Sequence, residues 1–214
     1  MPEDIIIVGA GGFGRETIDV VRAINAAASE PVWNLVGVVD DGPSPVHGAR
    51  LAALGVPHLG GIEELRSYGA STKYVIGIGS PSVRARLSER IDSWGGRAAT
   101  LIHPAAVVGS EVGIGEGSVV CGGAQISTNI VFGRHVHINP GAIVGHDCRL
   151  EDFVSINPGA IISGDVRVDS ETLIGAGAVV LQLLEVGPGA LVAASACVTK
   201  NVPAGATVRG VPAR

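Results

Sequence analysis

The sequence contains few aromatic residues and no long hydrophobic run. Phe, Trp and Tyr make up 3% of the 214 residues, whereas glycine alone contributes 32. A core of large rings is therefore excluded, and a thin structure whose interior holds medium-sized aliphatic side chains is favoured. No apolar stretch is long enough to span a bilayer, and the N-terminus lacks the charged-then-apolar layout of a signal peptide.

Basic clusters and metal-binding patterns are also missing. The net charge is −5 and no basic run occurs, which argues against nucleic acid as a partner. The three cysteines, Cys121, Cys148 and Cys197, are odd in number and lack the spacing of a metal site. Reduced cysteines are typical of the cytoplasm, so we expect a cytoplasmic protein that holds no metal.

Residues 101–202 carry an apolar residue at every sixth position. The series runs from Ile102 to Val198, and its seventeen positions hold sixteen aliphatic residues and Phe132. This period fits neither a helix, with 3.6 residues per turn, nor an ordinary strand, with a period of two. It indicates a stacked repeat in which each hexad forms a short strand and a corner. Three hexads make a coil of eighteen residues, so the sequence predicts a triangular solenoid of parallel strands with nearly six coils.

The region before the solenoid alternates strand-like and helix-like segments. Residues 4–8 are an apolar run that enters the glycine motif at residues 9–14 (GAGGFG), and residues 15–28 have helical periodicity. Further strands are predicted at residues 35–39 and 74–79 and helices at residues 62–68 and 81–94, with residues 42–61 as a connector. This order predicts a small parallel α/β domain in residues 1–97, followed by the solenoid in residues 98–214.

The glycine motif has three interpretations. Its glycines let backbone N–H groups approach an anionic ligand, and Asp40 and Asp41 end the next strand, where acids can accept hydrogen bonds from a ribose or a base. The ligand could be a nicotinamide cofactor, although nothing downstream resembles a dehydrogenase domain, or it could be a nucleotide sugar. The third interpretation is a purely structural turn that needs glycine for steric reasons.

Among the six histidines, His146 has the neighbours that a catalytic base needs. It occupies a corner of the repeat, and the next residue, Asp147, could orient the imidazole and leave one ring nitrogen basic. Gly164 follows eighteen residues later, directly over His146, and would leave space and a backbone N–H for a thioester carbonyl. His135 and His137 alternate on one strand and are expected to point outward.

The glycine motif followed by hexads resembles one enzyme family along essentially the whole chain. Residues 139–147 (NPGAIVGHD) are similar to a motif of the bacterial sialic acid O-acetyltransferases and the UDP-4-amino-sugar N-acetyltransferases. The resemblance implies an α/β Rossmann-like unit that binds a nucleotide sugar, followed by a left-handed parallel β-helix of hexapeptide repeats that transfers the acetyl group. It also implies a homotrimer with active sites between subunits and acetyl-CoA as cosubstrate.

The resemblance assigns roles to individual residues. It implies His146 as the general base and Asp147 as its support. The implied acetyl-CoA contacts are Gly164, Ala176, Ala194 and Ser155, and the implied nucleotide-sugar contacts are Gly11, Gly12, Phe13, Asp40, Asp41 and Asn139. The chain departs from the family twice. Ser155 stands where some members carry a second histidine that contacts acetyl-CoA, and Phe13 replaces a histidine often seen in the glycine loop.

We therefore expect an acetyl-CoA-dependent N-acetyltransferase that acts on the amino group of a UDP-linked amino sugar by direct attack. No neighbour of His146 suggests a covalent acyl-enzyme, since Cys148 falls at an inward position of the repeat. O-acetylation of a sialic acid or a related hydroxyl is the alternative, because the same base would serve it. A zinc hydratase of this fold would need histidines where the chain has Gly141 and Glu151. A non-catalytic scaffold would ignore acetyl-CoA.

Overall fold

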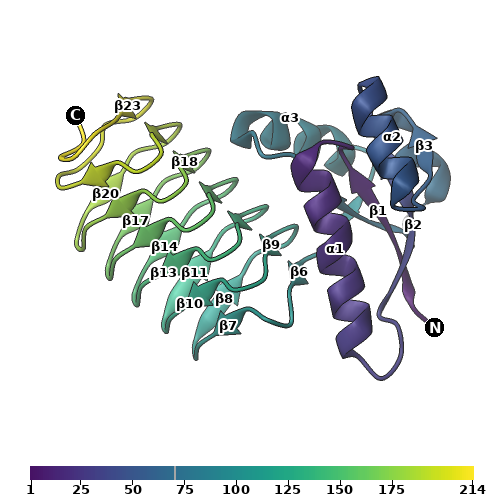
Figure 1. Cartoon of the computed structure of the whole chain (residues 1–214), viewed down its shortest axis with the longest axis horizontal. Helices are drawn as coiled ribbons and strands as arrows, with labels where there is room; N and C mark the ends of the chain where they lie inside the picture. Colours follow the sequence, from purple (N-terminus) through teal and green to yellow (C-terminus); the bar gives the residue numbers. More distant parts are fainter. Residues whose placement is uncertain (70) are drawn as a thin grey trace.

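The computed structural model describes residues 1–69 and 71–214, which form an α/β unit followed by a β-helix (Figure 1). The α/β unit contains one parallel sheet with the strand order β3-β2-β1-β4-β5. Its strands are β1 (Glu3–Val8), β2 (Trp33–Val39), β3 (His58–Gly60), β4 (Lys73–Ile76) and β5 (Arg97–Ala98). Its helices are α1 (Gly12–Ala27), α2 (Pro45–Ala53), α3 (Pro81–Asp92) and the 3₁₀ helix η1 (Ile62–Tyr68). No helix in these residues is both long and apolar enough to cross a membrane.

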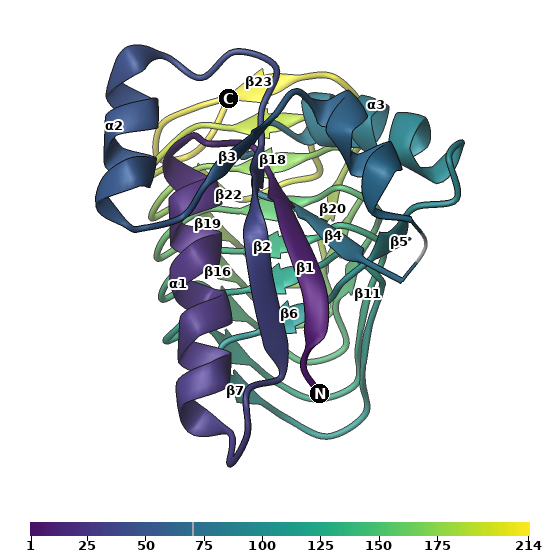
Figure 2. The same ribbon diagram turned by 90° about the vertical axis from the view of Figure 1, so that its right-hand side faces the viewer.

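Alternation along β1 sends its side chains into two different cores. Ile5 and Ile7 pack with α1 on one side of the sheet, whereas Ile6 and Val8 pack with residues of η1 and α3 on the other. The first of these cores also includes Leu101 from the start of the β-helix. Helix α1 therefore contacts both the sheet and the first coils, and Figure 2 shows the unit in front of the stacked coils.

The predicted connector at residues 42–61 is wrong, because these residues contain α2 and β3. Its prolines suggested a loop, but Pro45 occupies the first turn of α2, where proline is well tolerated. The Ser44 hydroxyl caps this helix by accepting a hydrogen bond from the His47 N–H at 3.3 Å. Helix α1 also begins earlier than predicted, at Gly12 inside the glycine motif.

The β-helix has three parallel sheets, one on each face of a triangular prism. The sheet that we call the covered face consists of β6 (Leu101–Ile102), β9 (Val119–Val120), β12 (His137–Ile138), β15 (Ser155–Ile156), β18 (Leu173–Ile174), β21 (Leu191–Val192) and β23 (Thr207–Val208). The apolar face consists of β7 (Val107–Val108), β10 (Gln125–Ile126), β13 (Ile143–Val144), β16 (Ile161–Ile162), β19 (Val179–Val180) and β22 (Cys197–Val198). The charged face consists of β8 (Val112–Ile114), β11 (Ile130–Phe132), β14 (Arg149–Leu150), β17 (Arg167–Val168) and β20 (Glu185–Val186).

The hexad residues fill the interior of the prism. Strand partners are eighteen residues apart, as Ile126 and Val144 show. From Val120 to Val198, every sixth residue is at most 3% exposed. The parallel β-helix predicted from the six-residue period is therefore confirmed. At its open end Ile102 and Val108 are 39% and 37% exposed, because no coil lies below them.

The outward side chains differ between the faces. On the apolar face Val107 and Ile143 are 55% and 40% exposed. On the charged face Arg149 and Arg167 form ion pairs with neighbouring acids, each with an N–O distance of 2.6 Å. On the covered face the outward residues of the first coils, such as Ser155, are buried under the α/β unit.

The two parts of the chain are joined by a buried arginine, Arg84 of α3. Its side chain is fully buried, and its guanidinium donates to the carbonyl oxygens of Ile78 at 2.9 Å and Phe153 at 2.7 Å. It also donates to the Ser155 hydroxyl at 3.0 Å and to the His135 carbonyl at 3.2 Å. Burial lowers the pKa of Arg84 to about 9, which still leaves it charged at neutral pH. The junction is therefore held by a cation whose partners are mostly neutral oxygens.

His135 and His137 are buried at this junction and do not reach solvent. Their side chains are 0% and 1% exposed, because the α/β unit covers the side of the coil from which they project. The His135 ring stacks on Phe153 with centroids 5.4 Å apart, and its Nε2 lies 2.9 Å from the Ser88 hydroxyl. Burial lowers the pKa of His135 to about 4 and that of His137 well below its usual value. His137 does project outward from its strand as expected, but the α/β unit covers this side of the coil, so neither histidine lies in solvent.

Candidate active site

His146 and Asp147 lie just after β13, on the edge between the apolar and charged faces. Nδ1 of His146 is 2.6 Å from Oδ2 of Asp147. Because a carboxylate can only accept, the proton resides on Nδ1 and Nε2 keeps a free lone pair. The His146 side chain is 62% exposed, so this lone pair is accessible. An accessible imidazole oriented by a carboxylate is the arrangement of a general base.

Gly164 stacks on the imidazole of His146, as the eighteen-residue coil predicts. A Cβ atom at position 164 would lie 2.5 Å from Cε1 and 2.6 Å from Nε2 of that ring. Any other residue would therefore displace the imidazole. The Gly164 N–H has no hydrogen-bond acceptor within residues 1–69 and 71–214, so this corner of the coil keeps an unused backbone donor.

Asn129 completes this cluster, and the sequence analysis did not select it. It lies one coil below Asp147, and its Nδ2 donates to Oδ1 of Asp147 at 2.5 Å. This hydrogen bond, followed by that from His146, lowers the pKa of the Asp147 carboxyl below its usual range. The signal was present in the sequence, because Asn129 precedes Asp147 by the same eighteen residues that separate His146 from Gly164.

An open groove of ≈ 540 Å³ runs beside His146. One wall is apolar and belongs to the apolar face, with Val107 and Ile143 among its residues. The other wall carries hydroxyl groups, including Ser110 and Thr128, whose oxygens are 2.9 Å apart. His146 thus lies beside a surface that offers both apolar side chains and hydroxyl groups.

The glycine motif contains glycines of two kinds. A Cβ at Gly14 would lie 1.9 Å from the Gly9 carbonyl oxygen, so Gly14 is needed for close packing of α1 against the sheet. Gly11 and Gly12, in contrast, have open space where a side chain would extend. No side chain caps the first turn of α1, so its N–H groups are available to an anion. The structural-turn interpretation thus accounts for Gly14, whereas close packing does not explain Gly11 and Gly12.

The carboxylate of Asp40 is hydrogen-bonded to the backbone of the glycine motif. Its Oδ2 accepts a hydrogen bond from the Ala10 N–H at 2.8 Å, and its Oδ1 accepts one from the Gly42 N–H at 3.0 Å. These bonds fix the carboxylate beside the loop backbone. The side chain is half-buried, so one edge still faces solvent at the end of β2.

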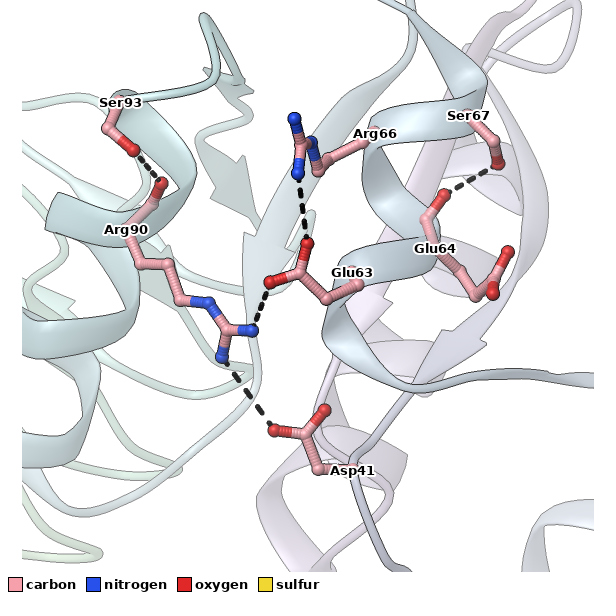
Figure 3. Close-up of polar contacts among 7 residues, drawn as sticks. All are labelled: Asp41, Glu63, Glu64, Arg66, Ser67, Arg90 and Ser93. Carbon is pink, nitrogen blue, oxygen red and sulfur yellow. Dashed lines mark hydrogen bonds and ion pairs between the residues drawn. The ribbon is translucent and has the colours of Figure 1, made fainter.

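Asp41 links β2 to η1. Its Oδ1 accepts a hydrogen bond from the Ile62 N–H at 2.8 Å. Its Oδ2 lies 3.9 Å from Nη1 of Arg90 in α3 (Figure 3). Arg90 also pairs with Glu63, whose carboxyl pKa is lowered mainly by that hydrogen bond. Asp41 is thus engaged in a polar network that holds η1 to α3.

Asn139 and Ser155 are buried and make structural hydrogen bonds. Asn139 is 7% exposed, and its Nδ2 donates to the Ile156 carbonyl of the next coil at 3.1 Å. Ser155 is 1% exposed, accepts from Arg84, and lies under the α/β unit. The structure therefore does not bring Ser155 to the groove beside His146.

The predicted site residues of the β-helix, apart from Ser155, fall on two edges of the apolar face. Ala176 and Ala194 are exposed at corners between the covered and apolar faces. Asn139 lies on the same edge. Nearby, the Phe13 ring of the glycine motif packs on the His137 ring of β12, with ring centroids 4.4 Å apart. His146 lies on the opposite edge. Within one chain the width of the apolar face separates the two groups.

The cysteines do not form a nucleophilic or metal-binding cluster. Burial raises the pKa of the Cys121 thiol to about 12 and also raises that of Cys148, so neither is a ready thiolate. The Cys148 thiol donates to the Ser163 carbonyl at 3.1 Å. In the part of the chain that the structure describes, no three His, Cys, Asp or Glu side chains form a group that could hold a metal ion.

Comparisons with known proteins are consistent along the chain. Residues 4–91 match the PglD N-terminal domain family. The chain is 36% identical over 153 residues to GDP-perosamine N-acetyltransferase of Escherichia coli O157:H7, which covers 69% of the chain and 64% of that relative. It is 34% identical over 118 residues to UDP-N-acetylbacillosamine N-acetyltransferase of Bacillus subtilis (strain 168). This match covers 55% of the chain and 51% of that relative. The matches thus span less than two thirds of the length of each curated relative.

One solved structure matches over nearly its full length. PerB from Caulobacter crescentus, in complex with CoA and GDP-perosamine, superposes on the chain with a TM-score of 0.85. The sequence identity is 30%, and the match covers 99% of this chain and 96% of that chain. The similarity therefore includes both the α/β unit and the β-helix.

Proposed function

This chain belongs to the PglD-like family of left-handed β-helix acetyltransferases, and from that premise we propose that it transfers an acetyl group from acetyl-CoA to a nucleotide-linked amino sugar. The observation that carries the proposal is the His146–Asp147 pair beneath Gly164, at the edge of an open groove. Two relatives bear the names of N-acetyltransferases, one for a GDP-linked and one for a UDP-linked sugar. This favours an amine acceptor over the hydroxyl of a sialic acid.

The α/β unit supplies the nucleotide-sugar site in this proposal. The uncapped first turn of α1, with Gly11, Gly12 and Phe13, offers N–H donors for the diphosphate. Asp40 and Asp41 directly follow β2, where acids can receive hydrogen bonds from the ribose or the base. We accordingly divide the chain into a substrate-binding part, residues 1–97, and an acetyl-transfer part, residues 98–214.

Transfer is a direct attack of the amine on the thioester. The neutral amine nitrogen forms a bond to the acetyl carbonyl carbon while Nε2 of His146 takes the proton that the nitrogen loses. The Gly164 N–H donates to the oxyanion of the tetrahedral intermediate. The intermediate then collapses, the C–S bond breaks, and the CoA thiolate receives the proton from His146. Asp147 stabilises the transient imidazolium throughout.

We propose that the working site forms between chains of a homotrimer. Phe13, Asn139, Ala176 and Ala194 lie on one edge of the apolar face and His146 lies on the other, so one chain cannot bring them together. In a closed ring of identical chains, the edge of the apolar face that carries His146 in one chain meets the opposite edge of the apolar face in its neighbour. The exposed apolar side chains Val107 and Ile143 would be buried there.

We assign the enzyme to the cytoplasm. Its three cysteines are free, which fits a reducing compartment. Acetyl-CoA as donor fits the same assignment, because a thioester of a large anionic carrier does not cross membranes unaided.

The test is thiol release from acetyl-CoA with GDP- and UDP-linked amino sugars, for the wild type and for His146→Ala. Loss of the base lowers kcat by about 10²- to 10⁴-fold. Activity that survives the substitution would place the base elsewhere. Turnover with a sialic acid alone would establish O-acetylation instead, and no turnover by the assembled protein with any acceptor would favour the scaffold.

A matched pair of glycine variants sharpens this test. Gly164→Ala places a methyl group 2.5 Å from the imidazole, whereas Gly113→Ala, on the charged face, has open space. We expect Gly164→Ala to lose activity without loss of folding, and Gly113→Ala to retain both. Equal activity in the two variants would contradict the stacking of His146 on Gly164 as part of the mechanism.

A further inference from the structure

We propose that Asn129 is a positioning residue that sets the tautomer of the base through Asp147. Within the described residues Asn129 makes no hydrogen bond to His146, and its side chain donates instead to the carboxylate with which His146 pairs. This inference rests on the proposed function, because it assigns a second layer of support to the same base.

The three side chains form a continuous chain of hydrogen bonds. Asn129 Nδ2 donates to Oδ1 of Asp147 at 2.5 Å, and Nδ1 of His146 donates to Oδ2 at 2.6 Å. Each carboxylate oxygen therefore has one side-chain donor. The Asn129 amide must present its NH₂ group here, since its oxygen would repel a carboxylate. Two donors on opposite oxygens fix the rotation of the carboxylate, which a single donor would not do.

The backbone holds Asn129 and Asp147 in matching positions. Both residues have left-handed conformations, with φ of 58° and 61°. The Asn129 N–H donates to the Ser110 carbonyl at 3.1 Å, and the Asp147 N–H donates to the Thr128 carbonyl at 3.1 Å. Asn and Asp tolerate this conformation better than most residues. The stacked corners thus point the two side chains at each other.

Among the residues that the structure describes, only Asn129 and His146 donate a side-chain hydrogen bond to Asp147. The charged residues that line the surface depression beside Asp147 are Arg149, Asp165, Arg167 and Glu185. Both arginines are engaged with other acids, Arg149 with Glu151 and Arg167 with Asp169, at 2.6 Å each. Within the described residues, the only ion-pair partner of Asp147 is His146 itself. Since the Asp147 side chain is 47% exposed, without Asn129 it would be free to rotate into water.

The consequence for catalysis lies in the protonation of the imidazole. A fixed, ionised Asp147 keeps the proton on Nδ1, which leaves Nε2 basic. If the carboxylate turns away or becomes protonated, the neutral ring can carry its proton on Nε2 and cannot then accept one from the amine. Asn129 opposes both changes, because its hydrogen bond orients the carboxylate and favours its charged form.

The test uses two substitutions and one matched control. Asn129→Asp keeps the shape and the backbone tolerance but places a second carboxylate against Asp147. Asn129→Gly removes the side chain without backbone strain. The control is Glu111→Gly, at the corner one coil below Asn129, where φ is 56°. All three proteins are compared with the wild type as the full chain.

Two readouts separate positioning from mere structural support. Nitrogen-15 NMR of selectively labelled histidine reports the His146 tautomer in the free protein, with no substrate present. We expect Nδ1–H in the wild type and in Glu111→Gly, and a shift toward Nε2–H in both Asn129 variants. Steady-state kinetics should show kcat lowered about 10- to 100-fold in the Asn129 variants, with KM for acetyl-CoA unchanged.

An unchanged tautomer and kcat in Asn129→Asp would overturn the inference. A loss of kcat with the wild-type tautomer would also overturn it, because Asn129 would then act by another route. If the tautomer shifts as expected but the wild type acetylates no amino sugar, the proposed function fails and the positioning of His146 by Asn129 stands.

Discussion

The covered and apolar faces of the β-helix relate polarity to exposure in opposite ways. On the covered face the polar side chains of His137 and Ser155 are 1% exposed, whereas on the apolar face Val107 and Ile143 are 55% and 40% exposed. Folding normally buries apolar groups and leaves polar ones in water. The covered face departs from that pattern because the α/β unit of the same chain lies over it, and for the apolar face the proposed trimer would supply the cover.

The two faces also differ in the kind of contact that each can make. The covered face is joined by directional hydrogen bonds, above all those of Arg84, so the α/β unit docks in one orientation. The apolar face offers mainly non-directional hydrophobic area, which suits a repeated contact with identical copies. The two halves of the predicted site lie on the two edges of this second face.

The largest expected effect comes from placing a charge on the apolar face. Val179 points outward from β19, so Val179→Asp would bury a carboxylate in the proposed interface at a cost of several kcal/mol. We expect sedimentation velocity to show monomers and the transferase activity to disappear. The matched control is Val131→Asp, because Val131 is 48% exposed on the charged face. A trimeric Val179→Asp protein, or a monomeric Val131→Asp protein, would contradict the proposal that the apolar face, and not the charged face, forms the trimer interface.

The next effect comes from removing the cation at the covered face. Arg84→Met leaves several buried carbonyl oxygens without a donor, which should lower the free energy of unfolding by about 4 kcal/mol. The measurement is unfolding in urea. The control is Arg86→Met, because Arg86 lies on the same helix but is exposed. Equal midpoints for the two variants would show that the junction does not depend on Arg84.

A smaller effect is expected from acid. Burial lowers the pKa of His135 to about 4, below the value near 6.5 of an unfolded chain, so the unfolded state binds the proton first. Stability from the neutral histidine is therefore complete above pH 6.5 and is lost progressively as the pH falls toward 4, by roughly 3 kcal/mol in all. Unfolding of His135→Asn should depend less on pH over this range. If the free energy of unfolding depends on pH in the same way for both proteins, the loss of stability in acid does not come from His135.

The β-helix could be predicted in detail because its period is short and unbroken. Every sixth residue from Ile102 to Val198 is apolar, and the stacking of residues eighteen apart follows from that alone. The same stacking correctly placed Gly164 over His146. Local turn chemistry was less informative, since Pro45 suggested a loop but begins α2.

The remaining features depend on packing between regions that the sequence pattern does not connect. Arg84 belongs to a short amphipathic helix, and nothing local indicates that its partners lie at Phe153 and Ser155. His137 does project outward from its strand, but only the position of the α/β unit determines that this side is buried. Asn129 lies eighteen residues before Asp147, within reach of the coil period, but the period alone does not show that its amide donates to the carboxylate.

The most direct test of the account is complementation between two inactive chains. His146→Ala removes the base on one edge, and Gly12→Glu places a negative charge in the glycine loop that serves the other edge. Each protein alone should be inactive. If sites form between chains, equal co-expression of the two variants should recover about a quarter of the wild-type activity, because random assembly brings both intact halves together at about a quarter of all interfaces. Mixed trimers that form but remain inactive would show that each site lies within a single chain.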